Sequence, residues 1–84
     1  MNKIISIHCL CDYKLKVEFI NGEVKIYDFS QQLNFPAFQP LKDKRVFSNV
    51  SLEHGVPVWL DGEIDIAPEV LYCDGVAYSQ GAWD

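Results

Sequence analysis

Residues 13–28 read YKLKVEFINGEVKIYD, and this stretch decides the fold. Its first half alternates apolar residues with Lys and Glu, which is the period of a strand with one buried face. Asn21-Gly22 follows, and this pair favours a two-residue type I′ turn because both central positions need positive φ. Two apolar pairs and one pair of opposite charge then face each other, namely Phe19 with Val24, Val17 with Ile26, and Glu18 with Lys25.

A strand over residues 3–11 extends this hairpin into a three-stranded antiparallel meander. A tight turn at Asp12 joins the strand to the hairpin. Successive side chains of the strand are expected to point to opposite faces of the sheet. The residues expected on its buried face are Ile5, Ile7, Cys9 and Cys11, and those expected on the other face are Ser6, His8 and Leu10.

Prolines and turn signals divide the rest of the chain into short elements. Pro36 and Pro40 keep any helix between residues 30 and 41 to a turn or two. Residues 46–52 read as a strand, and Glu53-His54-Gly55 supplies the turn into a second hairpin.

Residues 56–60 form the return strand of that hairpin. Pro57 cannot donate a ladder hydrogen bond, so this strand is expected at a sheet edge, or with its proline at a position that makes no such bond. Asp61-Gly62 then turns the chain again. Pro68-Glu69 suits the first turn of a helix and predicts a short helix over residues 67–72.

These elements predict an α+β fold: an antiparallel three-stranded meander, a short helical segment, a second β-hairpin and a short C-terminal helix. Residues 1–73 are expected to form a single compact domain, because a chain of 84 residues leaves room for one core. Residues 74–84 form a C-terminal tail whose order the sequence leaves open. A chain of this size could gain stability as a homo-oligomer.

Composition and charge argue against several classes of protein. Lys and Arg number 7 against 12 Asp and Glu, a net charge of -5 that phosphate backbones repel, so we expect a basic protein partner and no direct contact with nucleic acid. The N-terminus lacks the pattern of a signal peptide, and no stretch approaches the roughly 18 apolar residues of a membrane span. The odd count of 3 cysteines fits a reducing compartment, so the cytoplasm is the expected location.

Several motifs follow one another in a specific order: Asp12-Tyr13, Asn21-Gly22-Glu23, Tyr27-Asp28, Trp59 with Asp61-Gly62, and Asp65-Ile66-Ala67-Pro68-Glu69. Their order over residues 3–73 resembles the family catalogued as domain of unknown function 2442, a group of small bacterial proteins. The resemblance implies a compact α+β domain, and because the family has no established activity, it assigns no catalytic residue to this chain. Some members are fused to a helix-turn-helix domain, and many are encoded beside a small partner protein in what looks like a toxin–antitoxin or regulatory pair. Since this chain ends at Asp84, a DNA-directed role would come through a partner.

The cysteines raise the question of a metal site. Cys9 and Cys11 share one face of the predicted strand, and Cys73 and His8 are further potential ligands. Structural zinc sites usually combine paired Cys-x2-Cys units in knuckle turns, and this spacing differs from that pattern. We therefore interpret the cysteines as small buried apolar residues and expect no metal and no cofactor.

The densest charge cluster alternates along an extended segment, and its members are Asp61, Glu63, Asp65 and Glu69. A calcium loop of the EF-hand kind would need Gly at its sixth position and Glu at its twelfth, where this chain has Ile66 and Tyr72. Acids at a turn and a helix start are most often structural. Contact with a basic partner is the functional interpretation that stays open.

Trp59 admits three interpretations. Burial in the core is expected because Trp is highly buried on average. An exposed aromatic anchor would instead add binding energy to the acidic partner surface. A third possibility is a ligand pocket between the sheet and the short helices, lined by Trp59, Tyr27 and Phe38.

The residues therefore support two hypotheses of function. The first is a small non-catalytic protein-interaction module, with the regulatory or antitoxin-like member of a bacterial two-gene pair as a specific role. The alternative is a small-ligand-binding domain or minor enzyme that uses the pocket between sheet and helices. No catalytic residue is assigned, because the sequence contains no recognisable catalytic motif.

Overall fold

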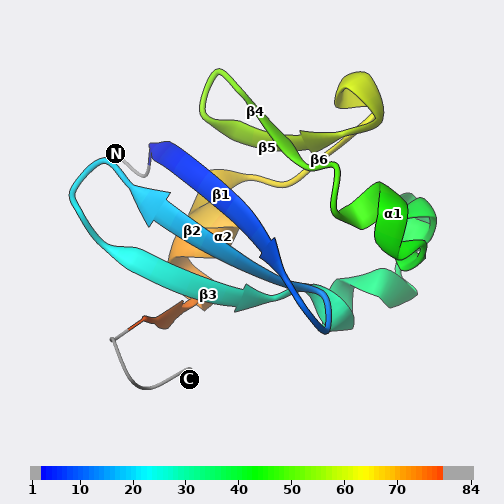
Figure 1. Ribbon diagram of the computed structural model, residues 1–84, viewed down its shortest axis with the longest axis horizontal. Helices are drawn as coiled ribbons and strands as arrows, with labels where there is room; N and C mark the ends of the chain where they lie inside the picture. The colour runs from blue at the N-terminus through cyan, green and yellow to red at the C-terminus, as the bar shows by residue number, and fades with distance from the viewer. Residues whose placement is uncertain (1–2, 79–84) are drawn as a thin grey trace.

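The computed structural model describes residues 3–78, which form two antiparallel sheets joined by short helical segments (Figure 1). The predicted α+β class, the meander, the second hairpin and the C-terminal helix are confirmed. The first sheet has the strand order β1-β2-β3-β7, and the second has the order β4-β5-β6. The elements in chain order are β1 (Ile4–Leu10), β2 (Lys14–Phe19), β3 (Val24–Asp28), η1 (Phe29–Asn34), η2 (Pro36–Lys42), α1 (Lys44–Phe47), β4 (Ser51–Glu53), β5 (Val56–Trp59), η3 (Leu60–Gly62), β6 (Ile64–Asp65), α2 (Pro68–Asp74) and β7 (Val76–Ala77).

The hairpin of β2 and β3 is confirmed, but its predicted register is wrong by one residue. The Gly22 N–H donates to the Phe19 carbonyl at 2.9 Å, and the Phe19 N–H donates to the Glu23 carbonyl at 2.8 Å. The loop therefore has three residues rather than two, with Gly22 at a φ of 90° as the left-handed residue of a G1-type bulge. In the observed register Leu15 faces Tyr27, Val17 faces Lys25, and Glu18 faces Val24.

The shifted register places Lys25 on the same face of the sheet as Val17, and α2 receives its side chain. The Lys25 ammonium donates to the Tyr72 carbonyl at 2.6 Å and lies 4.1 Å from the centre of the Tyr72 ring. The aliphatic stem is partly buried while the charge meets a helix carbonyl and an aromatic face. This contact holds the end of α2 against β3.

In β1 the predicted burial pattern is wrong at both ends. The pairing with β2 shifts between Ile4 and Ser6, a bulge that buries Ile4 at 2% exposure and leaves Ile5 50% exposed. Cys11 lies in the turn after the strand and is exposed, so only Ile7 and Cys9 pack against the core as expected.

The second sheet begins later than predicted. Residues 46 and 47 belong to α1, whose N-cap Asp43 accepts a hydrogen bond from the Arg45 N–H at 2.9 Å. Only Ser51–Glu53 forms the strand β4. The expected turn is confirmed at His54-Gly55, where both residues have positive φ, 53° and 80°, as a type I′ turn requires.

Pro57 does not lie on an edge strand, because β5 is the central strand of its sheet. Its carbonyl accepts a hydrogen bond from the Ile66 N–H at 3.2 Å, and proline has no N–H to return one. The paired part of β6 ends just before this point, at Asp65. The proline thus lies where the ladder stops. This agrees with the expectation that it occupies a position where its nitrogen makes no ladder hydrogen bond.

One aromatic core joins the two sheets. The Phe29 ring lies 5.5 Å from Trp59 and 5.7 Å from Phe47, measured between ring centres. Trp59 is 1% exposed, and its indole N–H donates to the Phe47 carbonyl at 2.9 Å. Among residues 3–78, every buried side-chain N or O atom has a hydrogen-bond partner, as burial requires.

Residues 74–78 continue the fold beyond the predicted domain boundary. Residues 76–77 form β7, which pairs with β3 at Lys25 and Ile26. Residues 79–84 of the predicted tail lie outside the described residues. Within the described part of the chain, no helix is long and apolar enough to cross a membrane.

Candidate functional site

The four predicted acidic residues are all exposed and follow one line along the chain. Asp61 lies in η3, Glu63 caps its C-terminal end, Asp65 points outward from β6 between two buried isoleucines, and Glu69 lies in the first turn of α2. In Figure 1 the chain runs from η3 at the end of the second sheet towards α2 behind the first sheet. The four carboxylates are thus spread along the segment from η3 through β6 to α2 rather than gathered at one point.

Two further residues belong to this edge, and sequence reasoning missed both. A carboxylate oxygen of Glu53 lies 3.7 Å from the position that a Cβ on Gly62 would occupy, so β4 contributes an acid beside η3. Leu60 adopts a φ of 53° and is 42% exposed. A non-glycine residue in this conformation is uncommon, and here it places an apolar side chain at the surface beside Asp61. We call Glu53, Leu60, Asp61, Glu63, Asp65 and Glu69 the acidic edge.

Among residues 3–78, no Lys, Arg or His forms an ion pair with a member of the acidic edge. Within residues 3–78, the structure shows an ion pair between Arg45 and Asp43 at 3.5 Å, and these residues belong to α1 and its N-cap, outside the acidic edge. The carboxylates of the acidic edge are therefore available to an external cation or a basic protein.

Trp59 takes the core position and not the exposed one. At 1% exposure it cannot serve as an anchor at the surface, because the core that joins the sheets encloses it. The three residues of the predicted pocket, Trp59, Tyr27 and Phe38, are separated by a fourth aromatic side chain. Phe29 packs among these three side chains, with ring centres at 5.5, 6.0 and 5.2 Å respectively, and fills the space between them.

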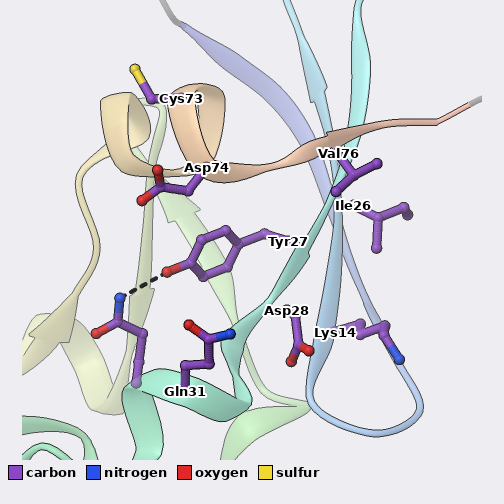
Figure 2. Close-up of a pocket in the computed structure, with 9 residues that line it drawn as sticks. Lys14, Ile26, Tyr27, Asp28, Gln31, Cys73, Asp74 and Val76 are labelled. Atoms are coloured by element: carbon purple, nitrogen blue, oxygen red, sulfur yellow. Dashed lines mark hydrogen bonds between the residues drawn. The ribbon is translucent and has the colours of Figure 1, made fainter.

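An open pocket does lie between the sheet and the short helices, beside Tyr27 (Figure 2). Its volume is about 750 Å³, within the roughly 300–1,000 Å³ range of small-molecule sites. It is lined by Lys14, Ile26, Tyr27, Asp28, Gln31, Gln32, Cys73, Asp74 and Val76. These residues come from β2, β3, η1, α2 and the start of β7.

Polar groups converge at one end of this pocket. Figure 2 shows the Tyr27 hydroxyl between the side chains of Gln31 and Asp74. The hydroxyl accepts a hydrogen bond from the Gln32 amide at 2.8 Å, while the Tyr27 residue as a whole is 5% exposed. Because the hydroxyl oxygen acts as an acceptor there, its own proton can be donated into the pocket.

Asp28 lies at the other end, beside Lys14 on the neighbouring strand. It ends β3 and caps η1, accepting hydrogen bonds from the Ser30 hydroxyl at 2.6 Å and the Ser30 N–H at 3.0 Å. These hydrogen bonds, the hydroxyl first and the backbone N–H second, lower the pKa of Asp28, and the charge of Lys14 adds to the effect. Asp28 therefore stays ionised at neutral pH.

The cysteines differ in their burial. Cys9 is half-buried and its thiol donates to the Phe47 carbonyl at 3.1 Å, whereas Cys11 and Cys73 are exposed. Burial raises the pKa of the Cys9 thiol, against the opposing hydrogen bond of the Val50 backbone. No group of three or more His, Cys, Asp or Glu side chains in residues 3–78 is placed to hold a metal ion.

His8 contacts Ser6 on the exposed face of β1, with 3.2 Å between its Nε2 and the Ser6 Oγ. This is a hydroxyl beside a potential base, but both side chains lie on the surface. Activation of a serine also requires donors for the developing oxyanion in a site that excludes water. The contact alone therefore assigns no catalytic role.

The comparisons with known proteins agree with the resemblance read from the sequence. A family model described as protein of unknown function (DUF2442) matches residues 4–75. This range includes the whole of α2 and every strand from β1 to β6, and it ends just before β7. No curated protein and no solved structure matches the chain. The fold, the ordered motifs and the match over most of the chain together show that the protein belongs to the DUF2442 family.

Proposed function

We propose that the chain is a non-catalytic protein-interaction module whose acidic edge binds a basic partner protein. The observation that carries the proposal is the run of exposed carboxylates on η3, β6 and α2, joined by Glu53 from β4. With a net charge of -5, the chain attracts basic surfaces at long range, and the acidic edge gives that attraction a direction.

Leu60 supplies the contact at short range. Exposed charges at a rim set the association rate, whereas most binding energy comes from apolar side chains that a partner buries. Leu60 is held at the surface by the left-handed turn of η3, next to Asp61 and close to Glu63. In this proposal the acids guide the encounter and Leu60 enters an apolar pocket of the partner.

The specific role that we propose is the regulatory or antitoxin-like member of a bacterial two-gene pair, acting in the cytoplasm. Membership of the family supports this role, because the resemblance implies a small protein encoded next door. The partner would then carry any action on nucleic acid, since the acidic surface described here is repelled by phosphate.

Charge reversal tests the proposal. The product of the adjacent gene is immobilised, and association of the chain is measured by surface plasmon resonance at low and high salt. Glu63→Lys should slow association roughly tenfold at low salt, and the difference should shrink as salt screens the charges. Glu18→Lys is the matched control, because Glu18 is an exposed glutamate of β2 outside the acidic edge and its reversal changes the net charge equally.

Leu60→Ala should speed dissociation and leave the association rate nearly unchanged, because an apolar contact acts after encounter. If the association rate does not change with salt, and if Glu63→Lys and Glu18→Lys change that rate equally, the acidic edge does not bind the partner.

The second candidate function is small-ligand binding, and the pocket of about 750 Å³ beside Tyr27 favours it. It lies between the sheet and the short helices, as the predicted pocket was expected to, but Tyr27 is the one predicted residue that lines it. It uses none of the residues of the acidic edge, so the two functions can be tested separately.

A further inference from the structure

The pocket beside Tyr27 brings three polar side chains together at one end. Figure 2 shows the Tyr27 hydroxyl between the side chains of Gln31 and Asp74 there. Lys14 lies at the opposite end, and its ammonium group points away from these three side chains. A small ligand bound at the Tyr27 end therefore meets a hydroxyl, an amide and a carboxylate, while the ammonium group of Lys14 stays out of its reach.

Tyr27 points to a ligand that accepts a hydrogen bond. The residue is 5% exposed, and its hydroxyl oxygen accepts a hydrogen bond from the Gln32 amide at 2.8 Å. Within residues 3–78, the structure shows this hydroxyl as an acceptor only, so its own proton is left to the pocket. A buried donor without an acceptor costs free energy, and an oxygen atom supplied by a ligand would remove that cost.

Asp74 and Gln31 add two further requirements. An ionised carboxylate only accepts hydrogen bonds, so Asp74 needs donors from the ligand and can take two of them side by side on its two oxygens. The Gln31 amide both donates and accepts. Both residues are exposed, so a ligand in the pocket can reach them. The ligand must therefore present donors and acceptors close together.

Charge narrows the choice of ligand groups. An anionic group is repelled by Asp74 and by the net charge of -5. An ammonium group would satisfy Asp74, but it cannot accept the Tyr27 proton because it has no acceptor. The nearby end of α2 also has a cation already, since the Lys25 ammonium donates to the Tyr72 carbonyl at 2.6 Å. A neutral hydroxyl group both donates and accepts, so neighbouring hydroxyls meet every requirement.

We propose that the Tyr27 end of this pocket binds a neutral sugar through two neighbouring hydroxyl groups. Both hydroxyls donate to the Asp74 carboxylate, one accepts the Tyr27 proton, and the other accepts a Gln31 amide proton. A monosaccharide fills only part of the volume of about 750 Å³, so a second sugar unit can extend towards Asp28. The inference rests on the second candidate function, because it names the ligand class of that pocket.

The test uses the full chain labelled for NMR and a panel of common neutral monosaccharides and disaccharides at millimolar concentration. We expect at least one sugar to shift the signals of Tyr27, Gln31 and Asp74 in a saturable manner. Analogues of that sugar that each lack one of the two bound hydroxyls should bind roughly fivefold more weakly, because hydrogen bonds are lost. Butylammonium and butyrate serve as cationic and anionic probes, and both should bind more weakly than the sugar.

Two variants with matched controls locate the site. Asp74→Ala should weaken sugar binding roughly tenfold, because hydrogen bonds to a charged group are lost. Glu18→Ala removes an exposed carboxylate outside this pocket and should leave the affinity unchanged. Tyr27→Phe keeps the ring and removes only the hydroxyl, so it should weaken binding roughly fivefold while the spectrum of the free protein stays that of a folded chain. Tyr78→Phe makes the same change outside this pocket and should have no effect.

The outcomes separate the inference from the function on which it rests. If butylammonium or butyrate binds at the pocket residues as tightly as any sugar, the pocket binds ligands but does not select hydroxyl groups, and only the inference fails. Sugar binding that Asp74→Ala and Tyr27→Phe leave unchanged would also overturn the inference, because the sugar would then bind elsewhere. If no probe shifts the signals of the pocket residues, the inference and the small-ligand function both fail.

Discussion

At the scale of single residues, Asp28 shows how one side chain can serve both the fold and a candidate site. It ends β3, caps η1 through Ser30 and lines the pocket beside Tyr27. The same hydrogen bonds that cap the helix also lower the pKa of its carboxyl group. Folding and ionisation of Asp28 are therefore linked.

The linkage predicts a pH dependence with a definite sign. A pKa that is lower in the folded than in the unfolded chain contributes stability above the unfolded pKa, and this stability is lost as the pH falls through the folded pKa. Asp28→Ala should lower the free energy of unfolding by about 1 kcal/mol at neutral pH through loss of the cap. The deficit should shrink in strong acid, where the carboxyl group of the parent protein is protonated.

Thermal unfolding of both proteins over a series of pH values measures this effect. Asp28→Asn serves as the control, because an amide oxygen can still accept the Ser30 hydrogen bonds but does not titrate. A deficit for Asp28→Ala that stays the same from neutral pH to strong acid would show that ionisation plays no part in the cap.

At the scale of elements, the sequence predicts which strands exist better than how they pair. The alternation in residues 13–19 identifies β2, but Asn21-Gly22 fits both a two-residue loop and the observed three-residue loop, and the two differ in register by one. Cross-strand pairs alone favoured the wrong choice. The observed register places Lys25 at the end of α2, and this is a contact with an element distant in sequence.

The same cause explains what the sequence missed at the candidate sites. Residues 46 and 47 read as a strand, yet the Asp43 cap starts a helical turn there. The pocket depends on the position of Tyr27 and on β7, and the two residues of β7 give too short a signal to identify from sequence. The acids were found because exposed charge is visible in composition, whereas Glu53 reaches them only through the fold.

The hairpin loop provides a test at this scale. Gly22 has a φ of 90°, and a Cβ built on it would meet no atom within 4 Å. The cost of a side chain is therefore conformational and not steric. Gly22→Val should lower the free energy of unfolding by about 1 kcal/mol or more, because a β-branched residue resists positive φ.

Gly22→Asn should cost clearly less than Gly22→Val, since Asn tolerates left-handed conformations. Denaturant unfolding of the three proteins gives the comparison. Equal stability of the Val and Asn variants would mean that the left-handed loop is not formed in solution.

At the scale of the whole molecule, two small sheets depend on one core. The strands of the second sheet are too short for independent stability, and Trp59 on β5 instead packs on Phe29 of η1 and Phe47 of α1. Its indole N–H also binds the α1 carbonyl of Phe47. The acidic edge is therefore held in place by residues that also cover the first sheet.

This arrangement predicts that both sheets unfold in a single transition. In denaturant, the NMR signal of the Trp59 indole N–H should disappear at the same midpoint as the amide signal of Val17 in β2, because neither sheet retains a buried face without the other. Phe29→Leu keeps an apolar side chain but removes the ring contacts with Trp59 and Phe47, and should cost on the order of 1–3 kcal/mol. It should lower both midpoints by the same amount.

Ile20→Val is the matched control, since Ile20 is 57% exposed in the hairpin loop and its substitution should leave both midpoints nearly unchanged. If the Trp59 signal is lost well before that of Val17, the second sheet and its acidic edge form a separate unit that can open alone, and the single aromatic core is not what stabilises them.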